Sequence, residues 1–276
     1  MTDGEAAQAS SVGGVDLFRL DGRVALVTGA AGYLGTAMAA ALAQAGAQVW
    51  LAGRNRDKLV SLAETLTAAG GRATPLPFDV TDAAARAAAL DSMAEQTDRL
   101  DVLVNNAHVG RSGSFTSAKP EDFVEAVLLS TAAAHALITG ALPLLERAAV
   151  DGSPSVINVA SMYGMVSPDP NNYTEERMQN PPFYGAAKAG LLQLTRHAAT
   201  HLGRRGVRVN AISPGPFPAA SPPAEPGLVD RLARRVPLGR IGKPEELCTT
   251  VLFLASPAST FVTGINIPVD GGWTAW

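Results

Sequence analysis

The sequence of 276 residues contains a single cysteine, Cys248. One cysteine excludes an internal disulfide and a metal site built from several thiolates, so we expect a reducing, cytoplasmic location. The chain has no uninterrupted run of about 18 apolar residues, and its first 17 residues include Asp3 and Glu5 and no apolar core. We therefore expect neither a membrane-spanning helix nor a signal peptide.

Charge is also sparse and balanced. The chain has 22 Lys and Arg against 25 Asp and Glu, a net charge of -3, and no block of like-charged residues. Such a surface does not favour nucleic acid or a membrane as the partner, which leaves a small molecule. Lysine is scarce, with Lys58, Lys119, Lys188 and Lys243 as its only occurrences, so a lysine within a motif is informative.

The hydrophobic share of 47% is nevertheless enough to build a folded core. Short apolar runs predict strands at residues 23–28, 48–52, 73–78, 101–104, 155–159, 207–212 and 266–269. Longer Ala-rich stretches predict helices at residues 33–45, 56–69, 82–96, 121–148, 184–204 and 244–256. This alternation predicts an α/β fold with a doubly wound parallel sheet of about seven strands and helices on both faces.

No linker divides the chain, so we expect a flexible tail at residues 1–19 and a single domain at residues 20–276. Two Pro-rich stretches, residues 165–182 and 214–237, follow the fifth and sixth predicted strands. Loops at the carboxyl ends of parallel strands are where such folds bind ligands. We therefore expect these two loops to form the rim of a substrate site.

A glycine-rich turn, TGAAGYLG at residues 28–35, joins the first predicted strand to the first predicted helix. Glycine lets the backbone turn with positive φ and lets a pyrophosphate approach the free N–H groups of a helix N-terminus. The flanking strand and helix supply the context that a dinucleotide site needs. Gly53 ends the second strand where an acidic residue would bind a ribose 2′-hydroxyl, and Arg54 follows it, which favours NADP(H), with NAD(H) also possible.

Tyr184 and Lys188 are four residues apart on a predicted helix, which places both side chains on one face. A free tyrosine titrates too high for a base at neutral pH, and a neighbouring cation is expected to lower its pKa. The pair is therefore suited to general acid–base chemistry.

The ordered motifs resemble the short-chain dehydrogenase/reductase family, in its compact single-domain branch. They are TGAAGYLG (28–35), DVTD (79–82), NNA (105–107), SMYG (161–164), YGAAK (184–188), PG (214–215) and DGGW (270–273). The resemblance covers the chain from Leu20 to its C-terminus. It implies a Rossmann fold and an enzyme that interconverts a ketone and a secondary alcohol by hydride transfer.

The resemblance also implies a role for each matching residue. Tyr184 exchanges the proton, Ser161 hydrogen-bonds the substrate oxygen, and Lys188 lowers the pKa of Tyr184 and holds the nicotinamide ribose. Ser130 stands at the position of the family's fourth catalytic residue, an Asn that holds a water in the proton relay. The residues implied in cofactor binding, besides Tyr184, Lys188 and Arg54, are Gly29, Ala31, Gly32, Tyr33, Leu34, Gly35, Asp79, Val80, Asn106, Ala107, Pro214, Gly215 and Phe217.

The sequence departs from the family pattern at several positions. Tyr33 replaces the middle glycine of the turn, so the spacing reads TGxxGxxG, as in the epimerase-like branch. Ser130 reaches less far than Asn, which puts the proton relay in question. His108 replaces the last glycine of NNAG, where it either binds a substrate hydroxyl or carboxylate in a pH-dependent way or serves only in packing.

The segment between Ser161 and Tyr184 is longer than is usual in the family and predicts a polar rim for a hydroxylated substrate. Candidate substrate contacts are His108, Met162, Tyr163 and Tyr173. No metal site is expected, because His197 and His201 lack a third ligand nearby in sequence. Two alternatives stay open: a non-catalytic dinucleotide sensor or scaffold, and an epimerase or dehydratase with tightly bound cofactor. A homotetramer or homodimer is also implied.

Overall fold

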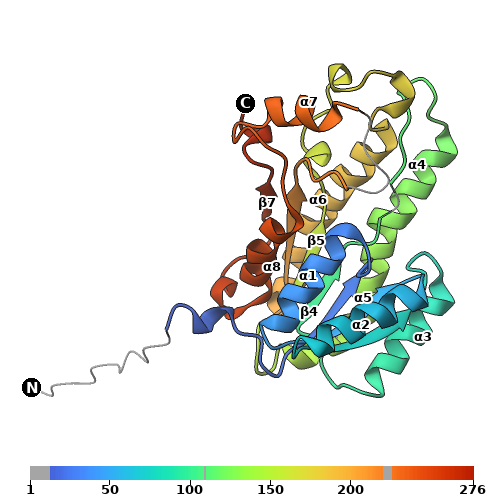
Figure 1. Ribbon diagram of the computed structural model, residues 1–276. Coiled ribbons are helices and arrows are strands. Elements are labelled where there is room, and N and C mark those ends of the chain that lie inside the picture. Colours follow the sequence, from blue (N-terminus) through green and yellow to red (C-terminus); the bar gives the residue numbers. More distant parts are fainter. Residues whose placement is uncertain (1–12, 109, 220–225) are drawn as a thin grey trace, which may run out of the picture.

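The computed structural model describes residues 13–108, 110–219 and 226–276. Within these residues the strands form one seven-stranded parallel sheet (Figure 1), which confirms the predicted fold class. In their spatial order the strands are β3 (Arg72–Pro77), β2 (Gln48–Gly53), β1 (Val24–Thr28), β4 (Val102–Asn105), β5 (Ser155–Val159), β6 (Arg208–Pro214) and β7 (Asn266–Val269).

Alternate residues of each strand pack against helices on opposite faces of the sheet, because successive side chains of a strand point in opposite directions. In β1, Ala25 and Val27 pack into one hydrophobic core, and Val24 and Leu26 pack into the other. The first core includes α1 (Tyr33–Gln44), α2 (Arg56–Ala68) and α8 (Cys248–Ala255). The second includes α3 (Ala83–Ala94), α5 (Ala133–Ala148) and α6 (Pro182–Leu202).

The strand order reverses at β1, which pairs with β2 on one side and with β4 on the other. The crossovers from these two strands leave on opposite sides, and a crevice opens at the carboxyl ends of the strands between them. The glycine-rich turn and the end of β4 therefore meet at one place. This switch point positions the candidate site.

The helical region predicted at residues 121–148 is divided into three parts. It consists of α4 (Pro120–Val127), a π-helical turn (Leu128–Ala132) and α5. By length and composition alone this region could cross a membrane. Buried residues of α5, among them Leu137, Ile138 and Leu145, pack into the second core, as expected of a core helix in a globular fold.

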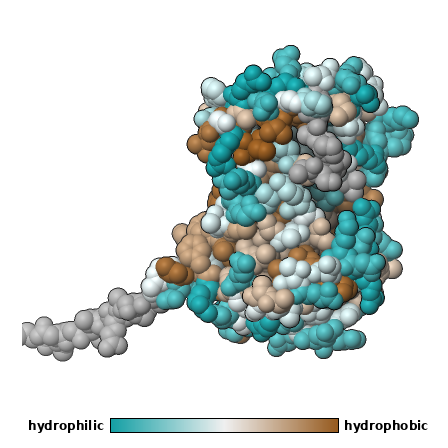
Figure 2. Space-filling view, viewed as in Figure 1, coloured by the Kyte–Doolittle hydropathy of each residue, from teal (hydrophilic) through white to brown (hydrophobic). Residues whose placement is uncertain are grey.

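The Pro-rich stretch at residues 214–237 contains a helix that we did not predict, α7 (Leu228–Arg235). Leu232 of α7 is buried against Met162, Val236 and Trp273. Figure 2 shows brown apolar surface gathered near α7. Residues 220–225 of this predicted loop lie outside the described part of the chain.

The predicted N-terminal tail is described only in part. Residues 1–12 lie outside the described range, and Asp16–Phe18 form a short 3-10 turn. Leu20 is buried in the first core, and its N–H donates to the carbonyl of Ala45 at 2.7 Å.

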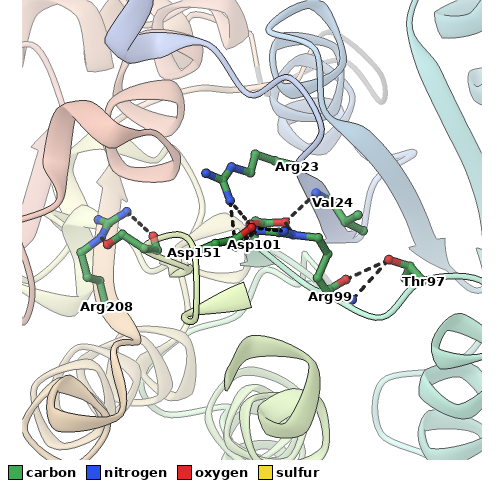
Figure 3. A network of polar contacts seen from close by, with 8 residues as sticks. Arg23, Val24, Thr97, Arg99, Asp101, Asp151 and Arg208 are labelled. Carbon is green, nitrogen blue, oxygen red and sulfur yellow. Dashed lines mark hydrogen bonds and ion pairs between the residues drawn. The ribbon is translucent and has the colours of Figure 1, made fainter. Parts of the chain in front are cut away.

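A charged network around Asp101 lies at the amino-terminal ends of β1 and β4 (Figure 3). Asp101 is 4% exposed and accepts a hydrogen bond from the Val24 N–H at 2.9 Å. The guanidinium groups of Arg23 and Arg99 also donate to it, at 3.1 and 2.8 Å, and Arg99 reaches the exposed Asp151 as well. Asp101 thus ties the start of β4 to the start of β1, far from the candidate site.

Candidate active site

The carboxyl ends of the strands border a cavity of about 730 Å³. Its volume is typical of a site for a small molecule or cofactor. Every residue predicted to bind the cofactor lines this cavity, namely Gly29, Ala31, Gly32, Tyr33, Leu34, Gly35, Arg54, Asp79, Val80, Asn106, Ala107, Tyr184, Lys188, Pro214, Gly215 and Phe217. Ser161 and His108 line it too.

The glycine turn forms a cradle that side chains would fill. Gly29 has a φ of +61°, in the left-handed region that favours glycine. A Cβ on Gly35 would lie only 2.1 Å from the Gly29 carbonyl oxygen. Gly32 precedes the first turn of α1, whose N–H groups have no partner within the helix and carry partial positive charge. These features fit the pyrophosphate of a dinucleotide.

Thr28 fixes this turn to the end of β4. Its hydroxyl accepts hydrogen bonds from the N–H groups of Asn106 and Ala107, at 2.9 and 3.0 Å. The Asn106 amide in turn donates to the carbonyls of Thr28 and Gly29, at 3.0 and 3.2 Å. Asn106 therefore braces the glycine turn, a role that sequence reasoning did not find. The signal was present, because Thr28 and Asn106 each belong to a motif.

At the end of β2, Gly53 and Arg54 line the cavity beside Lys58. The Asn55 side chain caps α2 by accepting from the Lys58 N–H at 3.0 Å, which fixes the start of that helix. On the adjoining strand, the N–H and hydroxyl of Thr81 donate to Asp79 and lower the pKa of its carboxyl group. This end of the cavity therefore carries two cations and one firmly ionised carboxylate.

The predicted catalytic side chains meet at the other end of the cavity. Ser161 is the second residue after β5, and Tyr184 and Lys188 lie on α6. Lys188 is 3% exposed, and its ammonium group donates to the Val159 carbonyl of β5 at 2.7 Å. Its nitrogen lies 5.8 Å from the centroid of the Tyr184 ring. The three side chains converge because α6 packs against the end of β5.

The pKa of Tyr184 is raised in the structure, whereas we expected it to be lowered. Burial raises the pKa of Tyr184, and a hydrogen bond with Ser161 opposes this rise. The expectation that Lys188 lowers this pKa is wrong for this structure, because the ammonium is directed to the Val159 carbonyl. Burial also lowers the pKa of Lys188 to about 8. Tyr184 is therefore protonated at neutral pH and is suited to donate a proton.

Ser130 lies in the π-helical turn and does not line the main cavity. Such turns occur frequently at functional sites. Thr131 of the same turn donates from its hydroxyl to the Ala187 carbonyl at 3.0 Å, which joins the turn to α6 beside Lys188.

Ser130, Asn105 and Lys188 line a second, small cavity of about 10 Å³, which has room for about one water molecule. The Asn105 side-chain oxygen is buried without a partner, while its amide donates to Asn158 at 2.8 Å. A water in this cavity would be within reach of groups that lack a partner. Asn105 was not among the predicted site residues.

His108 lies at the mouth of the main cavity, with its ring centroid 5.0 Å from that of Tyr184. Burial among its neighbours and the charge of Lys188 lower its pKa to about 4. The expectation of a pH-dependent contact near an ordinary histidine pKa is therefore wrong. His108 is neutral at pH 7.

Three predicted substrate contacts do not line the main cavity, namely Met162, Tyr163 and Tyr173. Met162 is 4% exposed and packs with Leu232 and Trp273 beneath α7. Tyr163 packs against the same cluster, and its pKa is raised by burial and by Tyr173, with which it forms a hydrogen bond. These side chains support the rim instead of facing the cavity. Sequence spacing could not show this, because the helix that covers them was not predicted.

The cradle and the converging Ser161, Tyr184 and Lys188 define an oxidoreductase that uses a dinucleotide. The chain matches the family model described as Enoyl-(Acyl carrier protein) reductase over residues 29–274. It belongs to the short-chain dehydrogenase/reductase family. A crystal structure of a short-chain type dehydrogenase/reductase from Mycobacterium marinum is 31% identical, with a TM-score of 0.83, and the match covers 96% of this chain and 100% of that chain.

Two further relatives carry names that refer to hydroxylated compounds. The cis-4-hydroxycyclohexanecarboxylate dehydrogenase of Sinomonas cyclohexanicum is 37% identical over 261 residues, which are 92% of this chain and 97% of the relative. A gluconate 5-dehydrogenase from Burkholderia cenocepacia J2315, solved with NADP and tartrate, is 31% identical with a TM-score of 0.83. That match covers 96% of this chain and 100% of the solved chain.

Proposed function

We propose that the protein is an NADP(H)-preferring enzyme of one catalytic domain that interconverts a ketone and a secondary alcohol on a polar, hydroxylated small molecule. The observation that carries this proposal is the convergence of Tyr184, Ser161 and Lys188 on the cavity that the glycine turn borders. The hydroxylated compounds named for the Sinomonas and Burkholderia relatives support the substrate class.

The acid–base chemistry follows from the protonation state of Tyr184. When bound, the nicotinamide supplies the hydride for reduction or accepts it in oxidation. Ser161 and Tyr184 hydrogen-bond the ketone oxygen, and Tyr184 donates its proton to that oxygen as the alcohol forms. In the reverse direction the alcohol proton passes to the tyrosinate. The Ser161 hydroxyl, whose hydrogen bond opposes the rise in the Tyr184 pKa, stabilises the tyrosinate.

Proton resupply runs through the buried side of the site. Lys188 has its pKa lowered to about 8, so it gives up a proton near neutral pH more readily than an exposed lysine. A water in the small cavity beside Ser130 and Asn105 would be within reach of Lys188. Ser130 thus takes the water-holding position, with a shorter side chain than the Asn of the family.

The preference for NADP(H) rests on the end of β2. Gly53 offers no carboxylate to a ribose 2′-hydroxyl, and the neighbouring Arg54 and Lys58 supply positive charge for a 2′-phosphate. Arginine forms bidentate hydrogen bonds with phosphate, which makes Arg54 the main determinant of the preference for NADP(H) over NAD(H).

A homotetramer or homodimer is part of the proposal. Val124, Val127 and Leu128 are exposed on the surface of α4 and the π-helical turn, at 69%, 43% and 46%. A contiguous apolar face of this kind is a common site of association between protein subunits. A cytoplasmic location is also part of the proposal, because the single cysteine, Cys248, is a free thiol, as is usual in a reducing compartment.

A panel of ketones and secondary alcohols, followed at 340 nm with NADPH or NADP⁺, tests the proposed activity. We expect turnover of at least one hydroxylated ketone or alcohol, with a lower KM for NADPH than for NADH. Binding of NADPH without turnover of any compound in a broad panel would contradict the enzyme function and favour the sensor. Tightly bound nucleotide and turnover without added cofactor would favour an epimerase or dehydratase.

A further inference from the structure

His108 is held in place by backbone that is fixed on its N-terminal side. It follows Asn106 and Ala107, whose N–H groups both donate to the hydroxyl of Thr28. The histidine therefore extends from the end of β4, at the switch point of the sheet. Its ring is tilted at 59° to that of Tyr184, with the ring centroids 5.0 Å apart. The position of the ring is set by the same contacts that form the cofactor cradle.

The imidazole of His108 has no hydrogen-bond partner among the described residues, and the side chain is exposed toward the cavity. The charged and titratable groups that face it are Lys188 and Tyr184. Its free nitrogens are therefore available to a ligand bound in the cavity.

The charge state limits what such a ligand group can be. With its pKa lowered to about 4, the imidazole is neutral at pH 7 and offers one N–H donor and one nitrogen acceptor. A hydroxyl group also both donates and accepts, so the two are complementary. A carboxylate would gain little, because a neutral imidazole supplies one hydrogen bond and no charge.

We propose that His108 binds a second hydroxyl of the substrate, on a carbon next to the reacting carbon, so that the preferred substrates are vicinal diols and α-hydroxyketones. The reacting oxygen is bound by Tyr184 and Ser161, and the histidine ring is in near contact with the tyrosine ring. The two rings are close enough for both to hydrogen-bond oxygens of one small molecule. This inference rests on the proposed function.

The test compares butane-2,3-diol with butan-2-ol as substrates, and acetoin with butan-2-one in reduction. The wild-type enzyme should favour the compound with the second oxygen by about tenfold or more in kcat/KM, because one hydrogen bond separates each pair. His108→Phe keeps an aromatic ring beside Tyr184 but removes both hydrogen-bonding nitrogens. We expect it to reduce this preference by about tenfold, and His108→Asn, which keeps a donor and an acceptor, to restore part of it.

The outcomes separate this inference from the proposed function. If His108→Phe lowers kcat/KM on both members of a pair by the same factor, the ring serves only in packing and the inference is wrong. A wild-type enzyme that prefers butan-2-ol, or shows no preference, overturns it as well. No turnover of these or any other alcohols and ketones, with NADPH still bound, would overturn the proposed function and this inference together. The midpoint of thermal unfolding checks that each variant is folded.

Discussion

The ammonium nitrogen of Lys188 lies 5.8 Å from the centroid of the Tyr184 ring and donates to the Val159 carbonyl. Tyr184 is therefore next to a cation but is not hydrogen-bonded to it. Burial controls its pKa in this arrangement and keeps the phenol protonated. The site is consequently prepared to donate a proton, as reduction of a ketone requires.

The pH dependence of the two directions should differ in sign. Reduction needs protonated Tyr184, so kcat/KM should be constant at neutral pH and fall as pH rises through the raised pKa. Oxidation needs the tyrosinate, so its kcat/KM should rise with pH. Neither profile should show an inflection between pH 6 and 7, because His108 stays neutral there. Initial rates from pH 5.5 to 11 at constant ionic strength measure this, and opposite slopes would contradict the assignment of Tyr184.

Replacing Arg54 should weaken the use of NADPH selectively. Arg54→Ala removes a charge-assisted contact worth about 1.5–3 kcal/mol, so KM for NADPH should rise by about tenfold or more while KM for NADH changes little. Arg56→Ala, at the exposed first residue of α2 and outside the cavity lining, is the matched control. Equal effects of Arg54→Ala on both nucleotides would show that the arginine does not recognise the 2′-phosphate.

The water-sized cavity predicts the behaviour of Ser130 variants. Ser130→Asn places a longer side chain with both donor and acceptor groups beside Lys188, and we expect a raised kcat with little change in KM. Ser130→Ala removes the hydroxyl and should lower kcat. Steady-state kinetics in H₂O and D₂O report whether proton transfer limits the rate. A neutral or harmful effect of Ser130→Asn would count against the proton relay.

The Asp101 network predicts a large effect on stability and none on the chemistry. Asp101→Asn leaves the guanidinium groups of Arg23 and Arg99 without their buried carboxylate, and we expect a loss of about 3 kcal/mol in the free energy of unfolding. Asp151, whose side chain is 63% exposed, provides the control. Asp151→Asn should cost less than about 1 kcal/mol. Urea denaturation followed by circular dichroism distinguishes the two, and equal losses would contradict the role given to Asp101.

The sequence predicted the sheet and the cofactor end of the site well because their signals are local. The glycine turn and the spacing of Tyr184 and Lys188 each lie within eight residues, and strand and helix periodicity places them at one edge of the sheet. Residues 29 and 31–35 of the turn line the same cavity as Tyr184 and Lys188. Short motifs of this kind depend little on how distant segments pack.

The rim and the long-range contacts could not be predicted in the same way. α7 was missed because the prolines before it indicate a loop, and its burial against Met162 depends on segments far apart in sequence. The π-helical turn at Ser130 has the same periodicity as its neighbours and gives no separate signal. The lowered pKa of His108 depends on burial in the packed site and on the charge of Lys188, 80 residues away. Such features need the packed structure.

The most direct test of the central claim replaces Tyr184 with Phe, which removes only the phenolic oxygen. We expect kcat for ketone reduction to fall by about 10²–10⁴, while NADPH still binds with a Kd close to that of the wild-type protein. Tyr173→Phe, which removes a hydroxyl that does not line the cavity, is the matched control and should keep most of the activity. A Tyr184→Phe enzyme that retains more than about a tenth of the wild-type kcat would contradict the claim that Tyr184 is the proton donor.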